Sequence, residues 1–419
     1  MFGLIGKTLS HSFSKEIHEI LNNESYNLIE LQELGSFFKQ KDFKGINVTI
    51  PYKQDVIKYL DVKSKIVEKT NSVNTIVNKD GYLYGYNTDY EGLKFLMQHN
   101  EILVENKSIL ILGNGSTSRT IEILCKELGS KNILKAARNP KNNDISFSDV
   151  QKYKNSHIII NATPSGMYPN NNDELLIDLK SFNQLEAVID LVYNPLETKL
   201  ISYAKSLNIK AVNGLLMLVR QAIKSCELFH NQEFNDYVTI DIYKNILFNM
   251  FNFVLIGMPM SGKSFYARSI SAFYNKMAVD IDKQISNNAE LEIPEIFSEY
   301  GEKGFREIET KIIYNVSKAS NQVISTGGGT ILNIINMEYL KQNGIIIFLD
   351  VPLEILKGMN PRNRPLLKNI DNLDKLYKDR YDLYLKYADI VINKTIMDES
   401  VVLKMIEVKI NEYINTKWS

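Results

Sequence analysis

The sequence predicts an α/β chain of more than one domain, with parallel sheets that carry ligands at the carboxyl ends of their strands. Three observations support this prediction. Short apolar runs alternate with helical stretches from residue 107 to residue 211, as in βαβ units. Two glycine-rich loops, Gly113–Arg119 and Gly257–Ser264, each follow an apolar run and precede a helical stretch. The 419 residues exceed what one hydrophobic core usually organises, so two or three domains are expected.

The balance of charge argues against nucleic acid or a membrane surface as a partner. The chain has 49 Lys and Arg against 49 Asp and Glu, a formal net charge of zero. No apolar run approaches the roughly 18 residues of a membrane span, and no signal peptide precedes the first apolar run, Phe2–Gly6. Cys125 and Cys226 are isolated, which argues against a disulfide framework or a thiolate metal site. We therefore expect a cytoplasmic protein that acts on small molecules.

The first 95 residues combine short strands with short helices. Apolar runs predict strands at Gly3–Gly6, Tyr26–Leu31 and Gly45–Ile50. Helical spacing of apolar residues predicts helices at Ser14–Asn22 and Ser64–Lys69. This mixture is typical of a small α/β domain.

The region from Lys107 to Ala211 alternates more regularly and predicts a parallel sheet with right-handed crossovers. Its expected strands are Ser108–Leu112, Asn132–Ala136, His157–Ile160, Ala187–Leu191 and Lys210–Val212. Helices are expected at Leu215–Phe229 and Tyr237–Asn249, and a new α/β unit begins at Phe251. We therefore place one domain boundary between residues 249 and 250.

The first glycine-rich loop has the pattern of a dinucleotide-binding turn. Gly113 and Gly115 would allow a tight turn and close approach of a pyrophosphate to the following helix, although Ser118 occupies the third glycine position. The next expected strand leads to Arg138 and has no acid to hold a ribose hydroxyl. A cation there suits a 2′-phosphate, which favours NADP over NAD. The alternatives are a plain β–α turn and a solvated arginine at a strand end.

Three polar segments, Asn47–Lys53, Asn71–Thr75 and Gly85–Asp89, lie at the ends of early strands. A lysine held beside a carboxylate, here Lys53 beside Asp89, offers what hydride transfer to a carbonyl requires. The developing alkoxide must be stabilised and supplied with a proton. Taken singly, Lys53 also fits a solvated surface lysine, and Asp89 fits the N-cap of the next helix.

Further motifs in the same half complete an ordered set, which comprises Gly6–Ser14, Asn47–Lys53, Val73–Thr75, Asn87–Asp89, Gly113–Ser118, Asn161–Thr163 and Gly214–Gln221. With this set, residues 1 to about 247 resemble shikimate dehydrogenase. The resemblance implies that Lys53 and Asp89 are the catalytic pair. It implies a substrate site formed by Ser12, Ser14, Thr49, Asn74, Tyr193 and Gln221. It implies an NADP site formed by Gly113, Gly115, Ser116, Arg138, Asn161 and Gly214, with Ser116 replacing a usual glycine.

The second glycine-rich loop meets every fixed position of the P-loop pattern. Backbone N–H groups between Gly257 and Gly262 would wrap the β-phosphate, Lys263 would reach the β- and γ-phosphates, and Ser264 would ligate Mg²⁺. Met260 stands where a glycine is frequent, and a positive φ there would cost roughly 1–2 kcal/mol. The alternative is an accidental turn.

Several segments follow this loop in order, namely Asp280–Asp282, Gly304–Glu309, Ser325–Gly329, Arg362–Leu366 and Arg380. Taken one at a time, these segments also fit plain alternatives, namely acidic loop residues, an i,i+3 pair on a helix, a turn made of glycines and solvated charges. In this order they resemble shikimate kinase across residues 251 to about 410. The resemblance implies that Asp282 deprotonates the attacking hydroxyl, that Asp280 joins Ser264 around Mg²⁺, and that Arg364 acts from a lid. It also implies a substrate site formed by Arg306, Gly328, Gly329 and Arg380.

Together the two resemblances imply a bifunctional enzyme that reduces 3-dehydroshikimate with NADPH and phosphorylates the shikimate formed with MgATP. They divide residues 1–249 into a substrate domain, 1–95 with 214–249, and a Rossmann-like NADP domain, 96–213. Residues 250–419 would form the P-loop kinase domain. One alternative is a quinate-type dehydrogenase joined to another small-molecule kinase. Another is a shikimate sensor without turnover, although the intact pair Lys53 and Asp89 and the intact Lys263, Ser264 and Asp282 argue against it.

Overall fold

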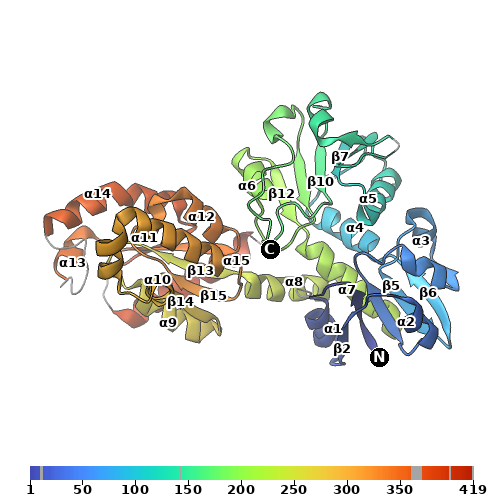
Figure 1. The fold of residues 1–419 in the computed structure, drawn as a ribbon, viewed down its shortest axis with the longest axis horizontal. Helices are drawn as coiled ribbons and strands as arrows, with labels where there is room; N and C mark the ends of the chain where they lie inside the picture. The colour runs from blue at the N-terminus through green and yellow to red at the C-terminus, as the bar shows by residue number, and fades with distance from the viewer. Residues whose placement is uncertain (10–12, 142, 360–369, 396–397, 418–419) are drawn as a thin grey trace. The chain divides into compact units, whose positions relative to one another are not determined.

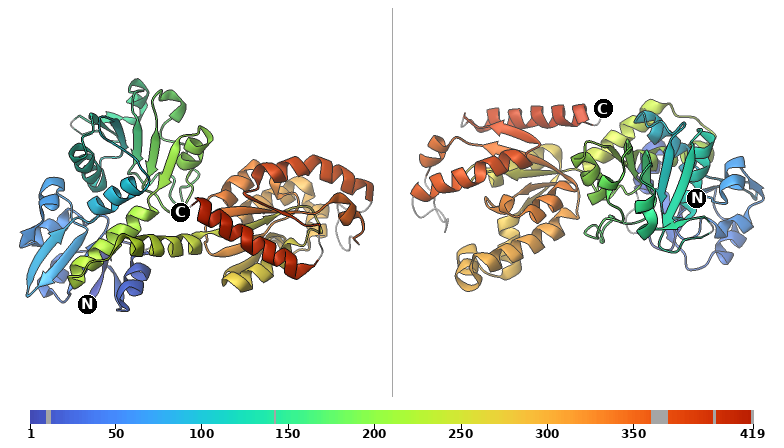
Figure 2. Two further views of the ribbon diagram at one scale, coloured as in Figure 1. Left: turned by 180° about the vertical axis from the view of Figure 1, so that it is seen from behind. Right: turned by 90° about the horizontal axis from the view of Figure 1, so that it is seen from above.

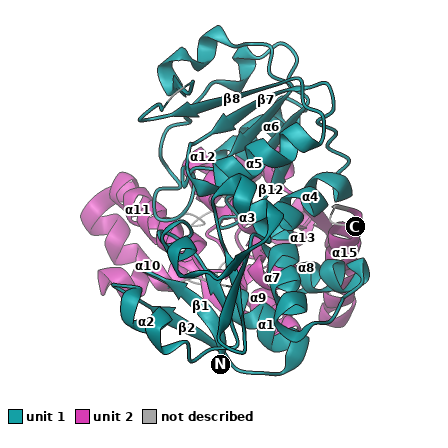
Figure 3. Cartoon of the chain, turned by 90° about the vertical axis from the view of Figure 1, so that its right-hand side faces the viewer, with its two compact units in different colours: residues 1–245 teal, residues 246–419 magenta. Residues whose placement is uncertain are grey.

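The computed structural model describes residues 1–9, 13–141, 143–359, 370–395 and 398–417. The chain divides into two compact units, Met1–Asn245 and Ile246–Ser419 (Figure 3). This division lies inside α8 (Asp236–Met250), shortly before the boundary expected between residues 249 and 250. Within the described part of the chain, no helix is long and apolar enough to cross a membrane.

Unit 1 opens with a mixed sheet in the order β2-β1-β3-β5-β6-β4. Strand β1 pairs in parallel with β2 and β3, whereas β5 runs antiparallel to both β3 and β6. The strands are β1 (Phe2–Gly6), β2 (Tyr26–Glu30), β3 (Gly45–Val48), β4 (Val62–Lys63), β5 (Thr75–Lys79) and β6 (Tyr82–Tyr86). The helical segments are α1 (Ser14–Asn22), α2 (Gly35–Gln40), η1 (Asp55–Tyr59) and α3 (Lys65–Thr70).

The antiparallel direction of β5 decides where its flanking polar residues lie. Asn74 precedes β5, and its carbonyl accepts a hydrogen bond from the backbone of Val48 at 2.8 Å. The start of β5 therefore lies at the same edge of the sheet as the end of β3. A tight turn at Asp80 and Gly81, with φ of +53° and +87°, then returns the chain along β6.

The second sheet of unit 1 is parallel, as predicted, with the order β12-β11-β10-β7-β8-β9. Its strands are β7 (Ser108–Leu112), β8 (Asn132–Ala137), β9 (Ile145–Ser146), β10 (Ile158–Asn161), β11 (Ala187–Asp190) and β12 (Lys210–Asn213). Crossovers run in opposite directions from β7, so right-handed connections place α5 (Ser116–Glu127) and α6 (Lys199–Ser206) on opposite faces (Figure 1). The glycine-rich loop after β7 thus lies where the strand order reverses, which is the usual ligand position in such sheets.

Long helices and short 3-10 segments complete unit 1. They are α4 (Asp89–His99), η2 (Phe147–Lys152), η3 (Leu179–Ser181), α7 (Leu215–His230) and the first part of α8. Most predicted boundaries differ from the structure by no more than one or two residues, and two of the differences have a local physical reason. Strand β3 ends at Val48 rather than Ile50, because residues 49–54 turn away from the sheet before Pro51 can end it. Ser64 is the N-cap of α3 rather than its first residue, and its side chain accepts from the backbone of Val67.

Unit 2 is built on a parallel sheet with the order β14-β15-β13-β16-β17, covered by helices on both faces (Figure 2). Its strands are β13 (Asn252–Ile256), β14 (Met277–Asp280), β15 (Gln322–Ser325), β16 (Gly344–Asp350) and β17 (Ile390–Asn393). Its helical segments are α9 (Lys263–Tyr274), α10 (Ile281–Ala289), α11 (Ile293–Ser317), η4 (Thr330–Leu332), α12 (Ile334–Lys341), α13 (Leu353–Lys357), α14 (Ile370–Tyr387) and α15 (Glu399–Lys417). The central strands read as unbroken apolar runs because both faces of the sheet are buried.

A buried lysine closes the end of α8 inside unit 2. Nζ of Lys276 donates to the carbonyls of Phe248 and Phe251 at 2.8 and 2.9 Å and to Oδ1 of Asn321 at 3.0 Å. Burial lowers the pKa of Lys276 to about 7. A cation at a helix carboxyl end is favourable because the last carbonyls carry partial negative charge. The helix that crosses the boundary therefore ends in a defined cap and not in a flexible linker.

A buried carboxylate ends strand β11 in the second sheet. Asp190 is fully buried; its Oδ2 accepts from the Thr198 hydroxyl at 2.6 Å, and its Oδ1 accepts from the backbone of Val192 and from Asn161 Nδ2 at 3.1 and 2.9 Å. Burial raises the pKa of Asp190 to about 6, and these hydrogen bonds offset part of that rise. An asparagine could accept the two bonds of Oδ1 without carrying a charge, and its Nδ2 would donate to the Thr198 hydroxyl, which reverses the direction of that bond.

Asp190→Asn should make the second sheet more stable at neutral pH. Burial raises the pKa of Asp190 in the folded chain above its ordinary value. The contribution of Asp190 to the free energy of unfolding is therefore complete below the ordinary pKa and is lost as pH rises through about 6. Relative to the unsubstituted chain, the variant should therefore gain up to about 3 kcal/mol between about pH 4 and about pH 7. Hydrogen exchange of the β10 and β11 amides measures this difference. A stability difference between the variant and the unsubstituted chain that stays constant across this pH range would contradict the expectation.

Candidate active sites

Lys53 and Asp89 form an ion pair at the edge of the first sheet. Lys53 Nζ lies 2.5 Å from Asp89 Oδ2, and the two side chains are 13% and 9% exposed. Lys53 follows β3, and Asp89 is the first residue of α4, whose N-cap is Thr88 and not Asp89. The positive end of the helix dipole favours the ionised carboxylate. An ammonium and a carboxylate in contact, largely shielded from water, can hold a proton beside a substrate oxygen.

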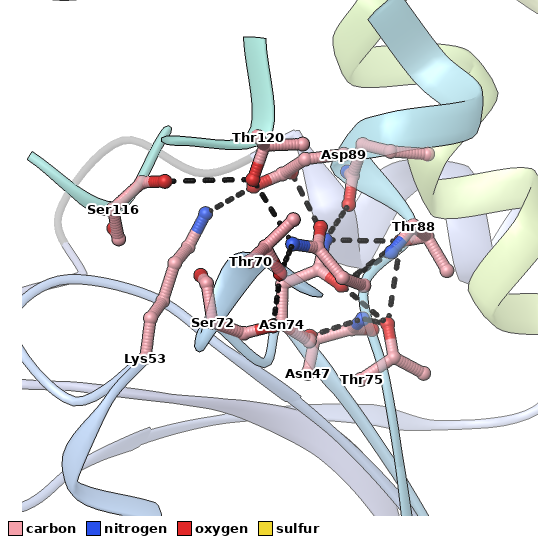
Figure 4. A network of polar contacts seen from close by, with 12 residues as sticks. Asn47, Lys53, Thr70, Ser72, Asn74, Thr75, Thr88, Asp89, Ser116 and Thr120 are labelled. Carbon is pink, nitrogen blue, oxygen red and sulfur yellow. Dashed lines mark hydrogen bonds and ion pairs between the residues drawn. The ribbon is translucent and has the colours of Figure 1, made fainter. Parts of the chain in front are cut away.

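Asn74 holds the other carboxylate oxygen of Asp89 (Figure 4). Its Nδ2 donates to Asp89 Oδ1 at 3.0 Å and lies 3.3 Å from Gln221 Oε1. Its Oδ1 accepts from the backbone N–H of Thr88 at 2.7 Å. Because a backbone N–H can only donate, this contact decides which way the Asn74 amide points. The orientation of Asp89 therefore follows from its neighbour in the chain, Thr88.

A buried layer of polar side chains supports Asn74, and the sequence analysis assigned no role to its members. Thr75 Oγ1 lies 3.1 Å from Asn74 Oδ1 and 2.7 Å from Ser225 Oγ. Asn47 donates to Thr75 Oγ1 and to Ser225 Oγ at 3.0 and 2.7 Å, and it accepts from the Tyr26 hydroxyl at 2.8 Å. Polar residues at inward positions of otherwise apolar strands are the signal that could have found this layer.

The other predicted substrate residues come from several elements of unit 1. Tyr193 follows β11 in the second sheet, and its ring lies 6.1 Å from that of Phe13, which is the N-cap of α1. Burial raises the pKa of Tyr193. The remaining residues are Ser14 at the start of α1, Thr49 after β3 and Gln221 on α7, whereas Ser12 lies outside the described residues.

The dinucleotide-type loop connects β7 to α5. Gly113 has φ of +109°, and a Cβ there would lie 3.1 Å from the Thr163 methyl group, so this position favours glycine. Gly115 is the N-cap of α5 and Ser116 is its first residue, so the N–H groups of the first turn face the loop. Gly214, from the same prediction, is the N-cap of α7.

Arg138 and Asn161 occupy different environments beside this loop. Arg138 follows β8 and is exposed, so its guanidinium is available to a ligand. Asn161 is buried; its Oδ1 accepts from the backbone and hydroxyl of Thr163 at 3.0 and 2.7 Å, and its Nδ2 donates to Asp190. These contacts shape the turn that packs against the loop. Asp144, a carboxylate that the sequence analysis missed, accepts from Asn114 of the loop at 3.0 Å.

The P-loop lies between β13 and α9 in unit 2. Lys263 Nζ donates to the carbonyls of Gly257 and Met258, each at 2.9 Å, and Gly262 is the N-cap of α9. Met260 has φ of +71°, the left-handed conformation that the sequence analysis considered for this position. Lys394, after β17, was missed; it is buried, and its ammonium donates to the Ser261 carbonyl at 3.3 Å. The Lys394 ammonium therefore stabilises the P-loop although Lys394 is not part of the P-loop motif.

Hydroxyl and carboxylate oxygens gather beside the P-loop. Ser264 Oγ lies 3.2 Å from Ser325 Oγ, and Ser325 is the register partner of Asp280 at the ends of β15 and β14. Among the described residues there is no cluster of three or more His, Cys, Asp or Glu that could hold a metal. This donor set fits Mg²⁺, which prefers oxygen and is usually held by one or two protein groups together with substrate phosphates. Ser264 and Asp280 are the residues that would hold it.

Two arginines converge on the glycine turn after β15. Arg380 is buried, and its Nη1 donates to the Gly328 carbonyl at 3.0 Å. Arg306 Nη1 lies 2.7 Å from Glu309 Oε2, which is the i,i+3 pair considered from the sequence. A Cβ at Gly329 would lie only 2.3 Å from Arg306 Nη2, so the guanidinium rests directly on the turn. Cationic groups from two helices therefore meet at one backbone segment.

Carboxylates surround the first glycine of this turn. A Cβ at Gly327 would lie 3.0 Å from Asp282 Oδ1 and 3.2 Å from Glu309 Oε1. Glu309 is fully buried, and its Oε1 accepts from the Thr330 hydroxyl at 2.6 Å, so it holds Arg306 in place. From the sequence, Glu309 fitted only an i,i+3 partner of Arg306. Arg364 lies outside the described residues.

Protein families match both units of the chain. The family model described as shikimate dehydrogenase substrate binding domain matches residues 4–76. The family model described as shikimate kinase matches residues 259–409. The two matched regions lie in different units of the structure.

Curated relatives and solved structures resemble the first part of the chain. "Shikimate dehydrogenase (NADP(+))" of Clostridium beijerinckii is 36% identical over 261 residues, covering 58% of this chain and 96% of the relative. The protein of the same name in Clostridium perfringens is 34% identical over 266 residues, covering 59% and 98%. A chorismate mutase/shikimate 5-dehydrogenase fusion protein from Clostridium acetobutylicum is similar in structure, with TM-score 0.55, 33% identity and coverage of 58% and 96%. Shikimate dehydrogenase 1 from Peptoclostridium difficile has TM-score 0.54, 36% identity and coverage of 58% and 97%. The chain therefore belongs to the shikimate dehydrogenase family and carries a shikimate kinase domain fused after it.

Proposed function

We propose that this chain catalyses two consecutive reactions. The first is reduction of 3-dehydroshikimate to shikimate with NADPH, and the second is phosphorylation of shikimate to shikimate 3-phosphate with MgATP. The observation that carries the proposal is the presence of a shielded lysine–carboxylate pair in one unit and a P-loop beside convergent arginines in the other. The product of the first reaction is the substrate of the second, so a fusion of the two families has a chemical rationale.

In the first unit, NADPH would supply the hydride, and the chain would handle the proton. Lys53 and Asp89 would face the carbonyl oxygen, with the Lys53 ammonium stabilising the developing alkoxide. The Asn74 and Gln221 amides lie beside this pair and would bind ring hydroxyls together with Thr49. The carboxylate of the substrate would be held by Ser12 and Ser14, with Tyr193 nearby.

The NADP site is assigned to the loop between β7 and α5. The first turn of α5 would hold the pyrophosphate through backbone N–H groups, with contributions from Gly113, Gly115 and Ser116. Arg138 would pair with the 2′-phosphate, since it is exposed beside the loop. Asn161 and Gly214 would shape the walls of the site, because the side chain of Asn161 is engaged with its own turn.

In the second unit, MgATP would supply the phosphoryl group. Asp282 would orient and deprotonate the attacking hydroxyl, and Lys263 with the backbone from Gly257 to Gly262 would bind the phosphates. Arg306 and Arg380 would clamp the substrate carboxylate with paired hydrogen bonds at Gly328 and Gly329. Arg364 would reach the transferring phosphate.

We assign the substrate domain to residues 1–95 with 214–249, the NADP domain to residues 96–213 and the kinase domain to residues 250–419. We also place the protein in the cytoplasm, because Cys125 and Cys226 are both free, which suits a reducing compartment.

Two assays on the purified full chain test the proposed function. Shikimate oxidation should be fast with NADP and slow with NAD or with quinate, and shikimate should drive ADP formation from MgATP. Preference for quinate and NAD would favour the quinate-type alternative. Shikimate binding without turnover in either assay would identify a sensor and would overturn the proposal.

Lys53→Ala should strongly reduce oxidoreduction and spare the kinase. Loss of the ammonium removes both alkoxide stabilisation and the proton relay, so kcat for shikimate oxidation should fall by roughly 10²- to 10⁴-fold. Lys58→Ala, at a nearby exposed lysine on η1, is the matched control and should leave both activities unchanged. Equal loss of both activities in Lys53→Ala would mean that the substitution disturbs the whole chain.

Gly329→Ala should weaken shikimate binding at the kinase site. The new Cβ would lie 2.3 Å from Arg306 Nη2, so the guanidinium must shift although Glu309 holds its other nitrogen. Because the displaced guanidinium loses a charge-assisted contact with the substrate, KM for shikimate should rise by roughly 10- to 100-fold. Gly358→Ala is the matched control, since a Cβ there meets no atom closer than 3.5 Å. An unchanged KM in Gly329→Ala would remove Arg306 from the substrate site.

A further inference from the structure

The residue before the Thr88–Asp89 segment reaches toward the dinucleotide-type loop. Asn87 is buried, and its Nδ2 donates to Thr120 Oγ1 at 3.0 Å and to Thr70 Oγ1 at 3.2 Å. Thr120 is on α5, the helix that begins directly after the glycine-rich loop. Three consecutive residues thus face three different partners: Asn87 faces α5, Thr88 faces Asn74, and Asp89 faces Lys53.

The polarity of these hydrogen bonds suits an amide at position 87. The Thr120 hydroxyl donates to the carbonyl of Ser116, the first residue of α5, at 3.4 Å, and the Thr70 hydroxyl donates to the carbonyl of Ile66 at 2.7 Å. Each hydroxyl has one hydrogen, so toward Asn87 each can only accept. The two N–H groups of one amide nitrogen satisfy both. Figure 4 shows Thr120 between Ser116 and the cluster around Asp89.

A second tie joins α4 to the far end of α5. The Tyr90 hydroxyl donates to Glu127 Oε2 at 2.5 Å, and Glu127 is the last residue of α5. This contact resembles the Asn87 contact in joining the segment around Asp89 to α5, but it lies at the opposite end from the glycine-rich loop. A substitution at Tyr90 would therefore loosen α5 without touching the end of the helix that carries the glycine-rich loop.

We infer that Asn87, acting through Thr120, is a positioning residue that sets the dinucleotide loop relative to the Lys53–Asp89 pair. The inference rests on the proposed oxidoreduction. Hydride transfer needs donor and acceptor at a defined separation, and a misplacement of about 1 Å can cost roughly 100-fold in rate. A rigid connection from the first turns of α5 to the residue two positions before Asp89 supplies that constraint through buried, directional contacts.

Thr120→Val tests the connection, because valine keeps the shape and removes the acceptor. It should lower kcat for shikimate oxidation by roughly 10- to 100-fold. It should also increase the primary deuterium isotope effect, measured with ring-deuterated shikimate that transfers the label, because slower hydride transfer becomes more rate-limiting. Thr120→Ser restores the hydroxyl and should recover most of the rate. Kinase activity of the same preparation should stay constant and reports the amount of folded chain.

Tyr90→Phe is the matched control, since it breaks the tie at the far end of α5 and should leave the isotope effect unchanged. Asn87→Leu combined with Thr120→Val should be no slower than the slower single variant, because both remove one connection. The inference is overturned if Thr120→Val keeps the rate and isotope effect of the unsubstituted chain, or if Thr120→Ser is as slow as Thr120→Val. Failure of the unsubstituted chain to oxidise shikimate would instead overturn the proposed function, and this inference with it.

Discussion

The ion pair between Lys53 and Asp89 is the interaction on which the first unit depends. Two charges removed from water are costly unless both are paired and hydrogen-bonded. One oxygen of Asp89 contacts Lys53, and the other accepts from Asn74. β5 runs antiparallel to β3 and starts where β3 ends, and the reversal at Asp80–Gly81 returns β6, with Asp89 after it, to the same edge. The buried layer of polar side chains that supports Asn74 and the contact of Asn87 with α5 then hold the Lys53–Asp89 pair from two sides.

The second unit reaches the same class of substrate by a different arrangement. Its cations come from α11 and α14 and meet at the glycine turn after β15, where small residues let guanidinium groups touch the backbone. The buried carboxylate of Glu309 holds Arg306, as Asn74 holds Asp89 in the first unit. In both units a functional charge is oriented by a neighbour whose own contacts are buried. The two sites therefore share a design principle although their folds differ.

Periodicity and loop motifs predicted the parallel sheets and placed the strands that were given ranges within one or two residues. Pairing of Lys53 with Asp89 followed from chemistry, but the support given by Thr75, Ser225 and Asn47 did not, because these contacts join residues far apart in sequence. Lys394 was missed because a single charged residue carries no pattern, whereas Glu309 was considered only as an i,i+3 partner of Arg306. The left-handed backbone at Met260 was considered because the motif usually has glycine there.

Catalysis in the first unit requires that Lys53 and Asp89 act as one unit, and a double-substitution cycle measures this coupling. kcat for shikimate oxidation would be measured for Lys53→Ala, Asp89→Asn and the chain that carries both. If the pair moves one proton together, the double variant should be no slower than the slower single variant, because the first substitution already removes the function. Losses that multiply in the double variant would show that the two side chains act independently and would contradict a shared role.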